Sequence, residues 1–227
     1  MDERVRVETP DGPGELVLDE AESPGAVLLL GHGAGGDVDG WDLGLLASRL
    51  PALGVSVARF RQPYRVAGKR IYSSRPGLDR GWVSALAAVR GVWPRLPLFA
   101  GGHSAGARAA CRGVDAHQRG LVLLSFPLHQ PGKPEKSRLD ELLAVDVPVL
   151  VVQGGADTFG TAAELREAVG DRPNVRLVEI ADAPHSLAPT ARTPPAVVDE
   201  RERRVLWVVS AFIEQQSRQP PAPAGTR

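Results

Sequence analysis

The chain has 227 residues, of which 43% are hydrophobic and 24% charged, and its 27 lysines and arginines balance 27 aspartates and glutamates. This length and composition are typical of one globular domain, and zero net charge gives no electrostatic reason to expect nucleic acid or an anionic membrane as a partner. The single cysteine excludes an intramolecular disulfide and any cysteine-based metal cluster.

The sequence lacks the marks of a membrane or secreted protein. No apolar stretch approaches the length of a membrane span, and the first residues, Met1 to Arg4, have no apolar signal region. No histidine or carboxylate cluster has the spacing of metal ligands. We therefore expect a cytoplasmic protein without a metal or cofactor; the oligomeric state stays open.

Short apolar runs alternate with helical segments along the chain. Residues 4–8 and 15–19, around Pro10-Asp11-Gly12, predict an antiparallel hairpin. Runs without polar alternation then predict strands buried on both faces of a parallel sheet, at 27–30, 55–60, 96–100, 121–125, 148–152 and 175–180. The intervening segments predict helices at 41–50, 78–93, 105–114, 137–143 and 161–169, and a last helix has an apolar stripe of Val205, Val208, Val209, Phe212 and Ile213.

This order of elements predicts an α/β fold in three layers, with a doubly wound, mostly parallel sheet, an amino-terminal antiparallel hairpin and no large lid. We expect a single domain over residues 1–216 and a disordered tail, rich in proline and alanine, over 217–227. The longest loops, 61–77 and 128–138, should lie near the functional site.

The pentapeptide Gly102-His103-Ser104-Ala105-Gly106 is the strongest local signal. It lies between an apolar run and a helix of small residues, and this strand–turn–helix context is what a nucleophile elbow requires. Such a turn exposes a serine hydroxyl, so Ser104 is the candidate nucleophile.

A serine hydroxyl needs a base to remove its proton and an acid to orient that base. Asp157 follows Val152 by five residues and His185 follows Ile180 by five, so both come directly after predicted strands. Functional groups in open α/β sheets gather at the carboxyl ends of the strands. Ser104, Asp157 and His185 should therefore meet at one edge of the sheet, in the chain order of a hydrolase triad.

Other titratable residues fit these roles less well. Asp146 precedes its strand and should lie at the opposite edge, whereas Asp182 is expected to shape the turn before the candidate base. His129 is expected to be a pocket residue or a surface histidine. His103 should point into packing rather than toward the candidate nucleophile, and His117 should be solvated.

The glycine-rich segment Gly31–Gly36 has two interpretations. It fits G-x-G-x-x-G after a strand, and Arg59 further along could meet a 2′-phosphate, so an NADP-dependent enzyme is one hypothesis. Against it, a hairpin precedes this strand, and the three predicted site residues downstream would have no role.

The second interpretation makes this loop half of an oxyanion hole, which we favour. Acyl transfer places negative charge on the carbonyl oxygen, where two backbone N–H groups can stabilise it. Ala105, directly after the candidate nucleophile, should supply one donor. Ala34 should supply the other, with Gly33 or Gly35 as alternatives.

A basic stretch follows the second buried strand and could bind a substrate carboxylate or phosphate, although we favour solvated surface side chains. It contains Arg59, Arg61, Tyr64, Arg65, Lys69 and Arg70.

With these motifs, the chain resembles the α/β-hydrolase superfamily from about Val5 to Phe212, most of all its small, lidless, dienelactone-hydrolase-like branch. That branch includes a testis-expressed protein and a subunit of the nonspecific-lethal complex. The resemblance rests on Gly31-His32-Gly33-Ala34-Gly35, Arg59-Phe60, Pro63-Tyr64, Gly102 to Gly106, Pro131-Gly132-Lys133-Pro134-Glu135-Lys136 and Gln153-Gly154 through Asp157-Thr158-Phe159-Gly160. It implies a Ser-Asp-His triad at the three residues named above; Thr158, where proline is usual, is a departure.

The sequence therefore predicts a serine hydrolase of the carboxylesterase or dienelactone-hydrolase type. It would cleave a small-molecule ester, thioester or lactone through an acyl-enzyme on Ser104. The alternatives are a catalytically idle hydrolase fold that binds other proteins and, third, the NADP-binding enzyme. The natural substrate is not predicted.

Overall fold

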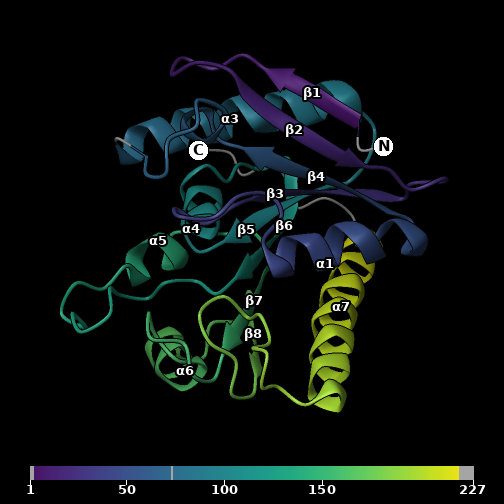
Figure 1. Cartoon of the computed structure of the whole chain (residues 1–227). Coiled ribbons are helices and arrows are strands. Elements are labelled where there is room, and N and C mark those ends of the chain that lie inside the picture. Colours follow the sequence, from purple (N-terminus) through teal and green to yellow (C-terminus); the bar gives the residue numbers. More distant parts are fainter. Residues whose placement is uncertain (1–2, 73, 220–227) are drawn as a thin grey trace.

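Strands and helices alternate along the chain in the computed structural model, which describes residues 3–72 and 74–219 (Figure 1). The strands in these residues are β1 (Glu3–Val7), β2 (Gly14–Asp19), β3 (Ala26–Gly31), β4 (Val55–Arg61), β5 (Leu98–His103), β6 (Gln118–Leu124), β7 (Val149–Gly154) and β8 (Val175–Ile180). The α-helices are α1 (Trp41–Arg49), α2 (Pro63–Val66), α3 (Arg75–Val92), α4 (Ala105–Arg112), α5 (Leu139–Leu143), α6 (Ala162–Val169) and α7 (Pro195–Ser217). A 3₁₀ turn, Pro51–Leu53, precedes β4.

The strands form one sheet in the order β1-β2-β4-β3-β5-β6-β7-β8. The amino-terminal hairpin of β1 and β2 is antiparallel and joins β4 in antiparallel register, while every other neighbouring pair is parallel. The carboxyl ends of β3 and β5 to β8 therefore share one edge of the sheet.

Helices cover both faces of the sheet, which explains why the strand sequences lack polar alternation. Leu28 and Leu30 of β3 pack with α1 and α7 on one face, and these two helices lie against each other (Figure 1). Val27 and Leu29 of the same strand pack with α3, α4, α5 and α6 on the other face. All four side chains are at most 1% exposed, so β3 is a central strand of the core.

The predicted three-layer, mostly parallel fold with an amino-terminal hairpin is confirmed, and the differences are local. Strand β5 runs to His103 rather than ending at residue 100, because its last residues pair with β6 immediately before the turn. The predicted loop 61–77 contains helix α2, which begins with Pro63 at its first position, where proline is favourable. In the predicted tail, Ser217 still belongs to α7, and residues 220–227 lie outside the described residues.

Candidate active site

Ser104 occupies a strained turn between β5 and α4. Its backbone angles are φ 52° and ψ −105°, a region that non-glycine residues rarely adopt and that costs on the order of 1–3 kcal/mol. The Ser104 N–H donates to the carbonyl of Leu124 at 3.0 Å, and the Ser104 carbonyl accepts from the N–H of Arg108 at 3.1 Å. The surrounding sheet and helix thus hold the strained residue in place.

Glycines on both sides of Ser104 let the turn approach β3 closely. Gly102 has φ +147°, and a Cβ atom there would collide with the backbone of Gly31. A Cβ atom on Gly106 would strike the same backbone. The elbow therefore requires glycine at both positions for steric reasons, as its sequence context predicts.

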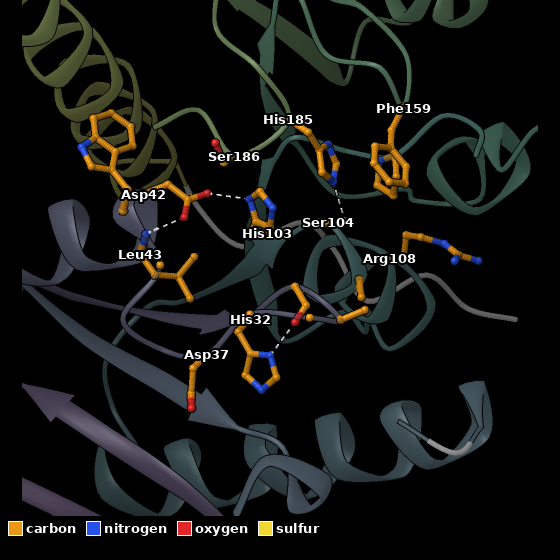
Figure 2. A pocket seen from close by; sticks show the side chains of 18 of the residues that line it. His32, Asp37, Asp42, Leu43, His103, Ser104, Arg108, Phe159, His185 and Ser186 are labelled. Atoms are coloured by element: carbon orange, nitrogen blue, oxygen red, sulfur yellow. Dashed lines mark hydrogen bonds and ion pairs between the residues drawn. The ribbon is translucent and has the colours of Figure 1, made fainter. Parts of the chain in front are cut away.

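The three predicted site residues form one chain of hydrogen bonds, of which Figure 2 shows the link between His185 and Ser104. The Nε2 atom of His185 lies 2.9 Å from the Oγ atom of Ser104, and its Nδ1 atom lies 2.8 Å from Oδ2 of Asp157. A carboxylate only accepts hydrogen bonds, so it fixes the imidazole proton on Nδ1 and leaves Nε2 free to accept the serine proton. This arrangement suits a base that deprotonates the hydroxyl.

Asp157 is held in position by two further donors. It is 1% exposed and lies just after β7, in the loop that leads to α6. Its Oδ1 atom accepts from the backbone N–H of Phe159 at 2.8 Å, and its Oδ2 atom accepts from Nε2 of Gln153 at 3.0 Å. These hydrogen bonds compensate the carboxylate for the loss of water.

Two rings border His185 in positions that the sequence did not predict. Phe159 stacks on the imidazole with a centroid distance of 4.1 Å, and its place two residues after Asp157 is the only signal that might have indicated it. The ring of His103 lies 5.1 Å from His185, and its Nδ1 atom lies 2.7 Å from Oδ2 of the buried Asp42. His103 makes no contact with the serine hydroxyl, as expected, but it borders the pocket instead of being packed away from it.

Asp42 also sets the charge of that second imidazole. Burial disfavours the protonated form of His103, but the nearby carboxylate outweighs this effect and raises the pKa of the histidine. The other oxygen of Asp42 accepts from the N–H of Leu43 at 2.9 Å. The raised pKa favours the protonated form of His103, which pairs with Asp42 beside His185.

A pocket of about 390 Å³ opens above Ser104, a size that suits a small organic ligand. Trp41 and Leu43 contribute apolar surface to its lining. Arg108 and Arg138 contribute positively charged groups. The pocket can therefore accommodate a substrate with one apolar and one polar part.

The loop after β3 brings the predicted oxyanion donors to this pocket, since Ala34 and Ala105 both line it. Neither backbone N–H donates a hydrogen bond to another residue in the described part of the chain. The carbonyl of Gly33 receives hydrogen bonds from Nδ1 of His32 and from the N–H of Gly36, at 2.8 and 3.1 Å. Because carbonyl and N–H of a trans peptide point in opposite directions, these contacts turn the N–H of Ala34 away from His32.

His32 and Tyr64 fasten this loop to the end of β4. The Nε2 atom of His32 accepts from the N–H of Gln62 at 3.2 Å, and burial lowers the pKa of this histidine, so its ring is neutral. The hydroxyl of Tyr64 donates to the carbonyl of Ala34 at 2.8 Å. Tyr64 thus acts on the loop rather than forming part of the pocket lining.

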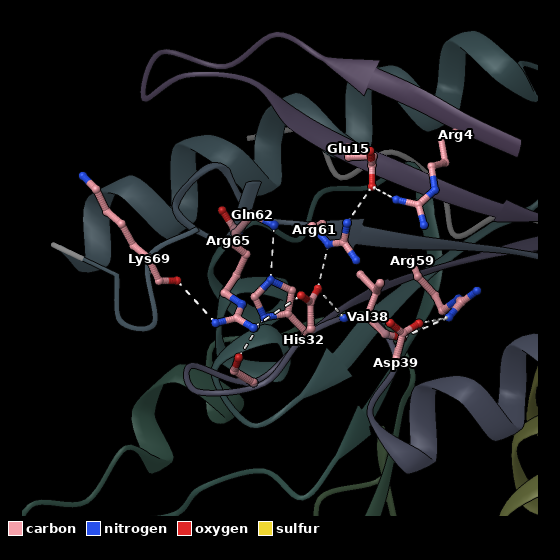
Figure 3. Close-up of polar contacts among 12 residues, drawn as sticks. Arg4, Glu15, His32, Val38, Asp39, Arg59, Arg61, Gln62, Arg65 and Lys69 are labelled. Atoms are coloured by element: carbon pink, nitrogen blue, oxygen red, sulfur yellow. Dashed lines mark hydrogen bonds and ion pairs between the residues drawn. The ribbon is translucent and has the colours of Figure 1, made fainter. Parts of the chain in front are cut away.

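The basic stretch does not form an anion site at the pocket (Figure 3). Arg59 pairs with Asp19 at 3.0 Å and with Asp39 at 3.3 Å, and Arg61 pairs with Glu15 and Asp37 at 2.9 and 2.8 Å. Arg65 also contacts Asp37, at 3.4 Å. Arg59 is 5% exposed and occupied by carboxylates, which argues against a role for it in binding a 2′-phosphate.

The remaining candidates lie where their sequence positions suggest, with one exception. Asp182 is exposed in the turn after β8 with φ 52°, Asp146 precedes β7, and His117 is exposed. His129 is neither a pocket residue nor a surface residue: it is 8% exposed, and its Nε2 atom lies 3.9 Å from Oε1 of Glu164 on α6. The loop folds back onto α6 and covers this ring.

The described residues contain neither a candidate membrane span nor a candidate metal site. No helix there is long and apolar enough to span a membrane. No group of three or more histidine, cysteine, aspartate or glutamate side chains in that part of the chain could hold a metal ion.

Solved structures from several organisms have the same fold. An α/β serine hydrolase homologue from Coxiella burnetii is 18% identical with a TM-score of 0.71, over 91% of this chain and 97% of that one. A serine hydrolase without a lid from Xanthomonas campestris is 19% identical with a TM-score of 0.67, over 92% and 94%. An esterase from Pyrococcus furiosus is 20% identical with a TM-score of 0.69, over 95% and 90%.

The family of the chain is shown by a match over most of its sequence. Residues 24–214 match the family described as an alpha/beta hydrolase domain, which is most of the chain. The strand order and the elbow of the structure agree with this match. The chain therefore belongs to the α/β-hydrolase superfamily.

Proposed function

We propose that the protein is a serine hydrolase that cleaves small esters, thioesters or lactones through an acyl-enzyme on Ser104. The observation that carries the proposal is the hydrogen-bond chain from Ser104 Oγ to His185 Nε2 at 2.9 Å and from His185 Nδ1 to Asp157 Oδ2 at 2.8 Å. The proposed enzyme is a single domain over residues 1–216. Its finer placement in the dienelactone-hydrolase-like branch rests on the segment 131–136 and is part of the proposal.

In the first step, Ser104 Oγ attacks the substrate carbonyl carbon while His185 Nε2 takes the hydroxyl proton. The carbonyl oxygen becomes an oxyanion, which the backbone N–H groups of Ala34 and Ala105 stabilise. Ala105 is the first residue of α4, where the helix dipole also favours negative charge. Removal of one such donor typically costs about 10²–10³ in turnover.

The tetrahedral intermediate then collapses as the bond to the leaving group breaks. His185 gives its proton to the leaving alcohol, thiol or lactone oxygen, and the acyl group stays on Ser104. Water attacks the acyl-enzyme with His185 again as base, which releases the carboxylic acid and restores the serine hydroxyl. Throughout, Asp157 keeps the imidazole in the required tautomer and stabilises its protonated form.

Hydrolysis of 4-nitrophenyl acetate tests the proposal. The purified chain should release 4-nitrophenol, and Ser104→Ala should reduce kcat by about 10⁴-fold or more, because members of a triad act as a unit. Ser48→Ala is the matched control, since this exposed serine of α1 bonds, among the described residues, only to the carbonyl of Leu45. Equal turnover by wild type and Ser104→Ala would defeat the proposal. No turnover by either protein would favour the alternative, a catalytically idle hydrolase fold that binds other proteins.

A further inference from the structure

Arg138 is a pocket residue whose charge has no partner in the described part of the chain. It precedes α5 and lines the pocket above Ser104. Its guanidinium makes one marginal contact, from an Nη atom to the carbonyl of Pro127 at 3.5 Å, and forms no ion pair with any described residue. A partly buried guanidinium with free donors is unusual, because such groups are normally paired.

Glu141, a carboxylate whose charge acts on Arg138, is already shared by other arginines. Glu141 accepts two hydrogen bonds from Arg108, at 2.8 and 2.6 Å. The same carboxylate lies 2.8 Å from Arg112 and 3.7 Å from Arg75. Glu141 attracts Arg138 without forming a hydrogen bond or an ion pair with it, and positive charge is in excess on this side of the pocket.

The surroundings of Arg138 disfavour its positive charge, as expected for a group that would be stabilised by a bound anion. Burial and, after it, the repulsion of Arg108 lower the pKa of Arg138. The group still stays protonated at neutral pH, since a guanidinium does not lose its proton in proteins. An anion bound here would relieve this repulsion.

Charged and apolar side chains line opposite sides of the pocket. Figure 2 shows Arg108 and Leu43 on opposite sides of Ser104. Tyr72 lines the pocket together with Arg108 and Arg138 and carries a further hydroxyl donor. A substrate bound across Ser104 would thus meet donors at one end and apolar side chains at the other.

We propose that Arg138 binds a carboxylate on the substrate and so makes the enzyme selective for esters, thioesters or lactones that carry a negative charge. The inference rests on the proposed function, because it assigns a specificity residue to the same site. Arg108 is held by two hydrogen bonds to Glu141, so it is not free to bind the anion bidentately itself.

Paired esters that differ only in charge test this proposal. One pair is mono-4-nitrophenyl adipate and its methyl ester, which places the carboxylate on the acyl part. The other is 4-acetoxybenzoate and its methyl ester, which places it on the leaving group. In at least one pair, wild type should show a higher kcat/KM for the anion. Arg138→Gln should reduce that preference about 10- to 100-fold, the range for one hydrogen bond to a charged group, because kcat/KM falls more for the anion than for its methyl ester.

Two variants control for charge and shape. Arg90→Gln removes one positive charge at an exposed pair with Asp115 and should keep the preference. Arg138→Lys should retain part of it, because the charge remains while the planar fork is lost. Equal preference in wild type and Arg138→Gln, or no preference in wild type for either pair, would overturn the inference.

Binding to a Ser104→Ala background separates this inference from the proposed function. Calorimetry should show the anionic ester of the preferred pair binding more tightly than its methyl ester, and Arg138→Gln in that background should remove the difference. This result supports the anion site even if wild type hydrolyses none of the esters, in which case the proposed function alone fails. Equal affinities for the two esters of both pairs would refute the anion site.

Discussion

Replacement of Asp157 by asparagine tests how the structure fixes the proton of His185. The carboxylate accepts hydrogen bonds from His185 Nδ1 at 2.8 Å, from Gln153 Nε2 at 3.0 Å and from the N–H of Phe159 at 2.8 Å. All three partners are donors, so the position suits a group that only accepts. An asparagine has nearly the same shape but turns an amide NH₂ toward at least one of these donors.

The more disruptive consequence concerns the tautomer of His185. With the amide nitrogen toward the ring, Nδ1 must accept a hydrogen bond, and the proton moves to Nε2. That atom lies 2.9 Å from Ser104 Oγ and could then no longer accept its proton. The wrong tautomer costs about 10⁴ in kcat in a serine protease, or roughly 5 kcal/mol of transition-state stabilisation, and we expect a similar loss with little change in KM.

Steady-state hydrolysis of 4-nitrophenyl acetate by Asp157→Asn and by the matched variant Asp182→Asn measures this effect. Asp182 is exposed, lies three residues before His185 and has φ 52°, a conformation that asparagine also adopts readily. The control should therefore keep its activity, and thermal unfolding should show both variants folded. Near-normal turnover in Asp157→Asn, or a larger loss in Asp182→Asn, would refute the reasoning.

Three further outcomes follow from the contacts around the site. Tyr64→Phe removes the 2.8 Å hydrogen bond to the Ala34 carbonyl and should lower kcat about 2- to 10-fold, the contribution of one hydrogen bond. An unchanged kcat would show that this hydrogen bond does not position the oxyanion loop for catalysis. In the wild type, the Asp42 carboxylate raises the pKa of His103 above 6.5, although burial lowers it. Asp42→Asn should therefore lower this pKa, which NMR titration of the ring measures. The stabilisation from this ion pair is full below pH 6.5 and is lost as the pH rises through the folded-state pKa, so wild type and variant should converge in unfolding free energy at high pH; a constant difference would contradict this. Gly106→Ala drives a methyl group into the β3 backbone and should destabilise the fold by about 1–3 kcal/mol in urea titrations, whereas an unchanged midpoint would show that the elbow tolerates a side chain there.

The hydrogen-bonded arrangement of Ser104, Asp157 and His185 could be predicted from the sequence, because each residue lies in an elbow or after a strand with a local signal. Ser104 lies in a glycine-flanked turn, and Asp157 and His185 follow β7 and β8 at the same distance from apolar runs. Parallel pairing then brings these carboxyl ends to one edge of the sheet. The long apolar runs likewise predicted the layers, since a strand covered on both faces has no polar side.

Contacts between side chains far apart in the sequence could not be predicted in the same way. Asp42 meets His103 across 61 residues, and neither position carries a local pattern that indicates the other. His129 was expected in a pocket or on the surface, but the fold of its loop onto α6 decides its burial. Arg138 lies in a loop that the sequence places near the site, yet only the side-chain geometry shows that Glu141 is occupied by other arginines.

The most direct test of the account is covalent labelling of Ser104 by a fluorophosphonate probe. Intact-mass and peptide analysis should show one adduct on wild type, located on Ser104, with none on Ser104→Ala or on denatured protein. His185→Ala should label far more slowly, because the hydroxyl has lost its base. No adduct on the native wild type, or equal labelling of Ser104→Ala, would contradict the central claim that this hydroxyl is an activated nucleophile.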